Sequence, residues 1–171
     1  SPGPLVYANT NADGAEQLWT AMPGGEPVSI PGTLGTRAAR WSPDGRVIAF
    51  QVFGDGIFLI NPDGSGRRQI AVASEETRFG EPIWSADGTS IAYALITLGV
   101  TGDTYEIEII DSVSGTPTRI PRGPHAAADW LEDGTFVGSA WRYEVPGLPA
   151  RNQELAIQTP DGTTTFLTET P

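Results

Sequence analysis

One short pattern recurs along the chain at a nearly constant interval. Three segments of the form Trp-x-x-Asp-Gly lie at residues 41–45, 84–88 and 130–134, and each precedes a short apolar run. The tryptophans stand at positions 41, 84 and 130, so successive copies are 43 and 46 residues apart. Self-similarity at a fixed period of this size indicates repeated units that stack on one another.

A second turn pattern follows each apolar run and completes the unit. It reads Pro-Asp-Gly at residues 62–64 and 160–162, with looser copies at 23–25 and 114–116. Proline presets the backbone angle φ for a turn, aspartate bonds to its own backbone, and glycine accepts a positive φ. Each unit therefore holds two hairpins and four short strands, which we call A to D in chain order.

Four-stranded units of this length are typical of β-propeller blades. The sequence predicts an all-β fold, a β-propeller of four-stranded antiparallel blades, in a single domain over residues 1–171. The first blade is expected to lack strand A, because Ser1-Pro2-Gly3-Pro4 already matches the A–B turn. The expected blades are residues 1–30 (partial), 38–71, 81–121 and 126–168.

The predicted ring is small or incomplete. Only residues 168–171 follow the last predicted strand, and Pro171 lacks the amide that a paired strand needs. Three arrangements stay open: a fragment of a longer protein, an unusually small ring, or half of a ring completed by a second copy. Open blade edges favour self-association.

The repeated motifs resemble those of TolB-like propellers, a family with WD-like repeats. The resemblance is carried by Trp41-Ser42-Pro43-Asp44-Gly45, by Ile48-Ala49-Phe50 and by Pro62-Asp63-Gly64-Ser65-Gly66, and it extends over nearly the whole chain. It implies a propeller fold and a bacterial setting outside the cytoplasm, so that the protein would be periplasmic, secreted or on the cell surface. Some prolyl peptidases carry such a propeller, but no Gly-x-Ser-x-Gly nucleophile motif is present.

Charge and composition exclude several classes of function. The formal net charge is −11, and all ten basic residues are arginines, so binding to nucleic acid or to an anionic membrane surface is disfavoured. No apolar run approaches the roughly 20 residues of a membrane span, so membrane insertion is not expected. The absence of cysteine excludes disulfides, thiolate catalysis and cysteine-ligated metals.

The sequence offers no catalytic or cofactor motif. Its one histidine, His125, lies in a turn-rich connection and is expected to be a rim residue. Residues 9–14 match the start of a calcium loop, but the twelfth position is Thr20 rather than glutamate, which favours an ordinary turn. We therefore predict no metal and no cofactor.

The connections between strands B and C grow along the chain and suggest a binding face. They run over residues 53–56, 96–104 and 141–153 in successive blades. The B–C and D–A connections of a propeller emerge on the same face, and insertions on one face often mark binding. Aromatic and arginine side chains dominate binding hot spots. The predicted binding residues are Trp141, Arg142, Tyr143, Arg151, Arg78, Phe79, Arg122 and His125.

Three functions follow from these features. The first is a non-enzymatic module that recognises a protein or peptide partner through this face. The second is a structural unit that completes a ring by self-association or with missing blades. The third, least favoured by the sequence, is a propeller enzyme such as a lyase or a glycan hydrolase.

Overall fold

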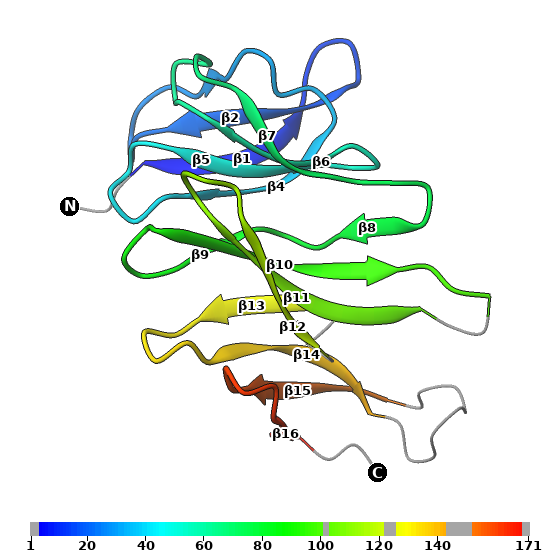
Figure 1. Cartoon of the computed structure of the whole chain (residues 1–171). Coiled ribbons are helices and arrows are strands. Elements are labelled where there is room, and N and C mark those ends of the chain that lie inside the picture. The colour runs from blue at the N-terminus through cyan, green and yellow to red at the C-terminus, as the bar shows by residue number, and fades with distance from the viewer. Residues whose placement is uncertain (1–3, 101–102, 122–125, 143–151, 169–171) are drawn as a thin grey trace.

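The chain folds into four antiparallel sheets, which succeed one another like the blades of a propeller (Figure 1). The computed structural model describes residues 4–100, 103–121, 126–142 and 152–168. Within these residues the regular structure consists of strands alone, so no helix is present that could cross a membrane.

The first two sheets show the full blade and its incomplete variant. Blade I has three strands in the order β1-β2-β3, whereas blade II has four in the order β4-β5-β6-β7. Among the described residues blade I therefore has no strand A, in agreement with the partial first blade predicted from the sequence. The strands of these blades are β1 (Leu5–Thr10), β2 (Glu16–Ala21), β3 (Val28–Ser29), β4 (Thr36–Trp41), β5 (Ile48–Val52), β6 (Gly56–Ile60) and β7 (Arg68–Val72).

Blades III and IV continue the series with longer central strands. Their strands are β8 (Thr77–Phe79), β9 (Ile83–Trp84), β10 (Ser90–Thr97), β11 (Thr104–Asp111), β12 (Pro117–Pro121), β13 (Ala126–Trp130), β14 (Phe136–Arg142), β15 (Asn152–Gln158) and β16 (Thr164–Phe166). Blade IV has the regular order β13-β14-β15-β16. In blade III, both β8 and β9 pair with β10, so that strand A is interrupted and begins at residue 77 rather than at 81.

The recurring turns form as their residue types predict. The Ser42 hydroxyl donates to Asp44 Oδ1 over 2.6 Å, and the same carboxylate oxygen accepts the Arg46 amide over 3.1 Å. Gly45 has a φ of 69°, in the left-handed region that glycine adopts without a Cβ clash. The hydroxyl of Ser85 and the carboxylate of Asp87 repeat the arrangement in blade III, at 2.6 Å.

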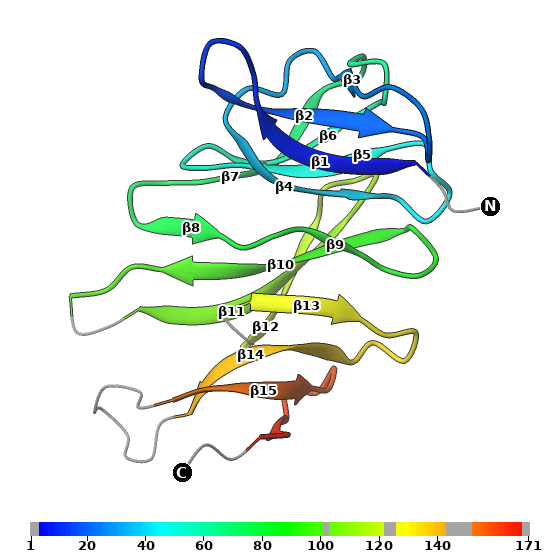
Figure 2. The same ribbon diagram turned by 180° about the vertical axis from the view of Figure 1, so that it is seen from behind.

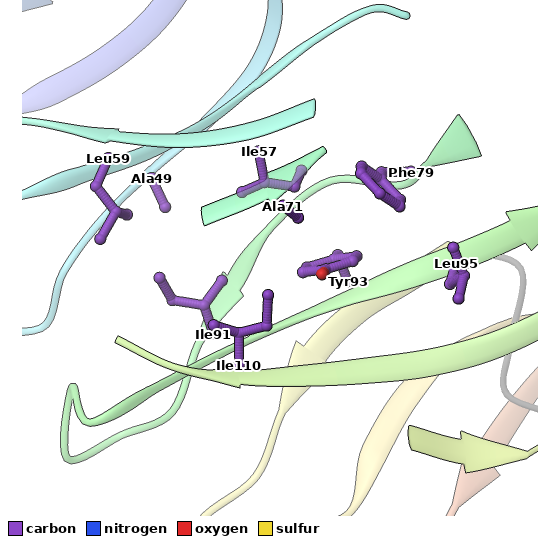
Figure 3. Packing of buried hydrophobic residues seen from close by; sticks show 9 residues of the cluster. All are labelled: Ala49, Ile57, Leu59, Ala71, Phe79, Ile91, Tyr93, Leu95 and Ile110. Atoms are coloured by element: carbon purple, nitrogen blue, oxygen red, sulfur yellow. The ribbon is translucent and has the colours of Figure 1, made fainter. Parts of the chain in front are cut away.

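Alternation along the strands supplies two apolar faces to each inner blade. In β5, Ile48 and Phe50 pack toward blade I, whereas Ala49 packs toward blade III. Figure 3 shows the resulting cluster between blades II and III, with Ala49, Ile57, Leu59 and Ala71 opposite Phe79, Ile91, Tyr93, Leu95 and Ile110. Full burial of one large apolar side chain contributes about 1.5–3 kcal/mol. The core is therefore divided into layers between the blades.

The series of blades does not close into a ring. Blade I and blade IV lie at opposite ends of the stack in both views of the molecule (Figure 2). The predicted fold, an incomplete β-propeller of four-stranded blades with a partial first blade, is confirmed.

Candidate functional site

The two ends of the strands form two chemically different faces. The loop face carries the B–C and D–A connections, including residues 53–55, 73–76, 98–100 and 103 among those described. The turn face carries the A–B and C–D turns. Figure 1 shows the loop face on its right side and the A–B turns on its left.

An exposed aromatic ring lies between two arginines on the loop face. Phe53, in the turn between β5 and β6, is 57% exposed. The guanidinium carbon of Arg37 lies 4.6 Å from the centroid of its ring, and that of Arg78 lies 6.0 Å from it. Both distances fall within the range of cation–π attraction. We call Arg37, Phe53 and Arg78 the arginine–phenylalanine cluster.

Local contacts hold the two guanidinium groups in place. Arg78 Nη1 donates to the carbonyl oxygens of Ser74 over 3.0 Å and of Thr77 over 2.7 Å. Arg37 Nε lies 3.7 Å from Glu16 Oε2, in an ion pair whose side chains are both more than half exposed. An arginine carries five N–H donors, so these contacts leave donors on both side chains that can face a ligand.

The structure separates Arg78 and Phe79, two predicted site residues that are adjacent in sequence. Arg78 lies in β8 at the loop face, with its guanidinium group beside Phe53, whereas Phe79 does not belong to an exposed loop. It lies in β8, is 8% exposed, and its ring centroid is 5.0 Å from that of Tyr93. Strand β8 pairs with β10 and turns Phe79 into the core between blades II and III.

The other predicted site residues belong to blade IV or to the connection before it. Trp141 and Arg142 end β14, where their backbones pair with Gln153 and Asn152 of β15. The remaining four, Arg122, His125, Tyr143 and Arg151, lie outside the described residues.

Blade III contains a buried polar network that the sequence did not reveal. The hydroxyl of Tyr93, which has no exposed surface, donates to Glu108 Oε1, and Glu108 Oε2 accepts a hydrogen bond from Arg119 Nε over 2.7 Å. Burial and the hydrogen bond to Glu108 raise the pKa of Tyr93 far above its usual range. These groups satisfy one another within the sheet, so we assign them a structural role.

Grooves lie on the turn face, between successive A–B turns. One of about 580 Å³ contains Asp44, Arg68, Trp84 and Asp87 in its lining. The Ser42 hydroxyl and the Arg46 amide hold the pKa of Asp44 below its ordinary value. The Ser85 hydroxyl, followed by the Thr89 amide, does the same for Asp87. Carboxylates that already accept bonds within their own turns are poorly suited to act as general acids.

The described residues show no group of three or more histidine, aspartate or glutamate side chains that could hold a metal ion. The segment that resembled a calcium loop is a turn in which Asn11 Oδ1 accepts the amides of Asp13 and Ala15, over 3.0 and 2.9 Å. The arginine–phenylalanine cluster therefore supplies the described loop face with arginine donors and an exposed aromatic ring, next to the carboxylate of Glu16.

Comparison with solved structures identifies the architecture. The chain superposes on an oligogalacturonate lyase in complex with manganese with a TM-score of 0.67 and 19% identity, over 90% of this chain and 42% of that one. It superposes on the oligogalacturonate lyase of Vibrio parahaemolyticus with a TM-score of 0.70 and 15% identity, over 98% and 50% of the two chains. The propeller domain of the Trilobed protease of Pyrococcus furiosus gives a TM-score of 0.60 and 17% identity, over 97% and 53%. The fold is that of a β-propeller.

The comparisons also bear on function. The sequence matches no protein-family model and no curated protein. The chain spans about half the length of the two lyases, and the similar structures include lyases and peptidases. The prediction of a non-enzymatic module for a protein or peptide partner is therefore wrong, because the propellers that superpose best among these are enzymes. The narrower likeness to TolB-like propellers stays an expectation from the sequence.

Proposed function

We propose that the chain is the propeller part of an enzyme that acts on an anionic oligosaccharide, with the loop face holding the substrate. The proposal is supported by the superposition on two oligogalacturonate lyases. At 15–19% identity this likeness by itself concerns the fold, so the substrate class must be argued from this chain's own residues.

The single observation that carries the proposal is the arginine–phenylalanine cluster. A galacturonate unit presents a carboxylate and a sugar ring with an apolar face. Arginine is the side chain best suited to bind a carboxylate through paired N–H donors. An exposed aromatic ring such as Phe53, 57% exposed, offers a surface on which the sugar ring can pack.

The net charge of −11 limits how strongly such a substrate can bind. At physiological salt, charges farther apart than roughly 8 Å are largely screened, so most of the acidic surface acts weakly at the cluster. Glu16, which lies 3.7 Å from Arg37 Nε, is an acidic group that does act there. Weak, salt-sensitive binding is therefore expected. The described part of the chain would bind and orient the sugar. Its residues do not group to hold the manganese of the similar lyase, so we assign them no metal-dependent step.

A titration of the protein with trigalacturonate tests the proposal. Binding, followed by calorimetry, should weaken about tenfold in the double variant Arg37→Ala, Arg78→Ala. The neutral galactose trimer should bind the parent protein no more strongly than it binds the double variant. Arg46→Ala is the matched control, because Arg46 is 84% exposed at the turn face and 3.8 Å from Asp44 Oδ2.

The chemical step is tested separately, by ultraviolet absorbance of the unsaturated product that a lyase releases from trigalacturonate. The protein together with its native flanking sequence should form this product. Equal binding of the charged and neutral trimers, or an equal loss of binding in Arg46→Ala, would contradict the assignment of substrate class.

A further inference from the structure

A second groove lies on the turn face, between the A–B turns of blades III and IV. Its volume is about 500 Å³, within the range of small-molecule sites. The turn between β9 and β10 supplies Asp87, and the turn between β13 and β14 supplies Leu131 and Glu132; these turns are neighbours on the left side of Figure 1. The half-buried Trp130 also lines the groove. The lining therefore combines an aromatic ring, an apolar side chain and carboxylates from two blades.

The turn of blade IV departs from the repeat at two residues that line this groove. Blades II and III have Ser42 and Ser85 directly after the tryptophan, and each hydroxyl donates to the aspartate of its own turn over 2.6 Å. Blade IV has Leu131 at this place, followed by Glu132 where the other blades have proline or alanine. Leu131 is 43% exposed and cannot make the serine's bond. Residues that break a local rule without a structural gain are expected at functional sites.

The charges in this groove have one sign. Asp87 Oδ1 accepts the Ser85 hydroxyl over 2.6 Å, the Thr89 amide over 3.0 Å and the Thr89 hydroxyl over 2.9 Å, and these bonds fix the carboxylate in place. Its other oxygen, Oδ2, accepts no bond from the residues that the structure describes. Glu132 is exposed and has no hydrogen bond or ion pair to any described residue. None of the described lining residues is basic, whereas the neighbouring groove contains Arg68. The groove between blades III and IV is therefore suited to a cation.

The apolar part of the lining selects among cations. A methylene chain gains free energy when it is buried against apolar side chains such as Trp130 and Leu131. An indole ring also attracts an ammonium group that lies over its face. Because Asp87 and Glu132 come from different blades, a chain with an ammonium group at each end can pair with both carboxylates.

We propose that the groove between blades III and IV binds an alkyl diammonium ion, whose charged ends pair with Asp87 and Glu132 while its methylene chain packs on Trp130 and Leu131. The site lies on the turn face, away from the arginine–phenylalanine cluster. It therefore does not depend on the proposed enzymatic function.

The probe is 1,4-diaminobutane, titrated into the ¹⁵N-labelled protein at pH 7 and low salt. It should shift the Leu131 amide resonance and the Trp130 indole resonance with one saturation curve, and added salt should weaken its binding. The monoamine n-butylamine keeps the chain but has one ammonium group, and should bind about fivefold more weakly. Magnesium ion has the charge of the diamine without a methylene chain, and should also bind more weakly.

Three variants complete the test. Glu132→Gln removes one carboxylate without disturbing a described contact, and should weaken binding of 1,4-diaminobutane about fivefold. Leu131→Ser restores the residue type of blades II and III, and should weaken binding about threefold without lowering stability in urea. Asp44→Asn is the matched control, because Asp44 has the place of Asp87 one blade earlier and lines only the neighbouring groove. It removes the same charge as Glu132→Gln and should leave binding unchanged.

Four results would overturn the proposal. The first is the absence of a saturable shift at Leu131 and Trp130 when 1,4-diaminobutane is added. The second is equal binding of n-butylamine or of magnesium ion. The third is binding like that of the parent in both Glu132→Gln and Leu131→Ser. The fourth is an equal loss of binding in Asp44→Asn and Glu132→Gln, which would show that the diamine responds to the net charge of the protein rather than to this groove.

Discussion

The buried Tyr93 makes the stability of this chain depend on alkaline pH in a way that can be worked out. A tyrosine ionises near pH 10 in an unfolded chain, whereas burial and the bond to Glu108 raise the pKa of Tyr93 in the folded state. Below pH 10 the group is protonated in both states, and its contribution to stability is fully present. Above pH 10 the unfolded chain loses this proton while the folded chain keeps it, so stability falls as pH rises.

The expected slope is one proton, or about 1.4 kcal/mol per pH unit. The loss should therefore reach about 1.4 kcal/mol at pH 11 and about 2.7 kcal/mol at pH 12, a large part of the total stability of a small domain. The sequence makes the measurement clean. It has no lysine and no cysteine, so no side-chain amine or thiol contributes to the decline in this range.

The assay is urea unfolding followed by circular dichroism at intervals between pH 8 and pH 12. Tyr93→Phe should lower stability by about 1.5–3 kcal/mol at pH 8, because it removes a hydrogen bond to a charged group. It should also reduce the slope of stability against pH above pH 10 by the equivalent of one proton, or about 1.4 kcal/mol per pH unit. Tyr7→Phe, at a half-exposed position, is the control for the replacement of a tyrosine by phenylalanine. A parent and a Tyr93→Phe variant that decline in parallel would refute the buried network.

Three further results are expected from the same unfolding measurements. Trp84→Phe should lower the free energy of unfolding by about 1 kcal/mol, because it removes the hydrogen bond that the indole N–H donates to the carbonyl oxygen of Arg40 in blade II. Trp41→Phe should lower it clearly less, because the indole N–H of Trp41 has no such partner among the described residues. Equal losses in the two variants would contradict this difference. Gly56→Ala should lower the free energy of unfolding by at least about 3 kcal/mol, because a Cβ at this position would lie 2.0 Å from a backbone carbonyl oxygen. Gly45→Ala is the comparison: its Cβ would meet nothing within 4 Å, so backbone strain alone should lower stability by about 1 kcal/mol. Acidification below about pH 4 should lower stability, because hydrogen bonds depress the pKa of the turn aspartates in the folded state. Asp87→Asn should therefore lose less stability than the parent between pH 6 and pH 2. The same acid profile in the parent and the variant would contradict this role of Asp87.

The repeat spacing predicted the blades because turn chemistry is local. A turn of the form Ser-x-Asp-Gly closes through its own hydroxyl, carboxylate and amide groups, as at Ser42, Asp44 and Gly45, so the sequence itself specifies where each hairpin turns. The partial first blade was predicted from the same turn chemistry, because residues 1–4 match the A–B turn. Strand A of blade III was harder to predict because it consists of two parts, β8 and β9, separated by a segment that contains Pro82, which has no amide hydrogen to donate.

The arginine–phenylalanine cluster could not be predicted, because it joins three blade elements that are distant in sequence. Arg37 lies in β4, Phe53 in the β5–β6 turn and Arg78 in β8. The pairing of β4 with β5 inside blade II and the packing of blade III against blade II bring them together. Phe79 was misplaced for the converse reason. The blade was predicted to begin at residue 81, so Phe79 was assigned to a connection, whereas it lies in β8 and the alternation of that strand directs it into the core.

The alternation within β5 has a consequence for how such a chain can diverge. Neighbouring residues Ile48 and Ala49 serve two different layers of the core, so inserting or deleting one residue within the strand would disrupt both layers at once. The connections at the loop face carry no such double duty and can change length freely. Insertions and deletions are therefore expected at the loop face, where new side chains can be added while the layered core stays the same.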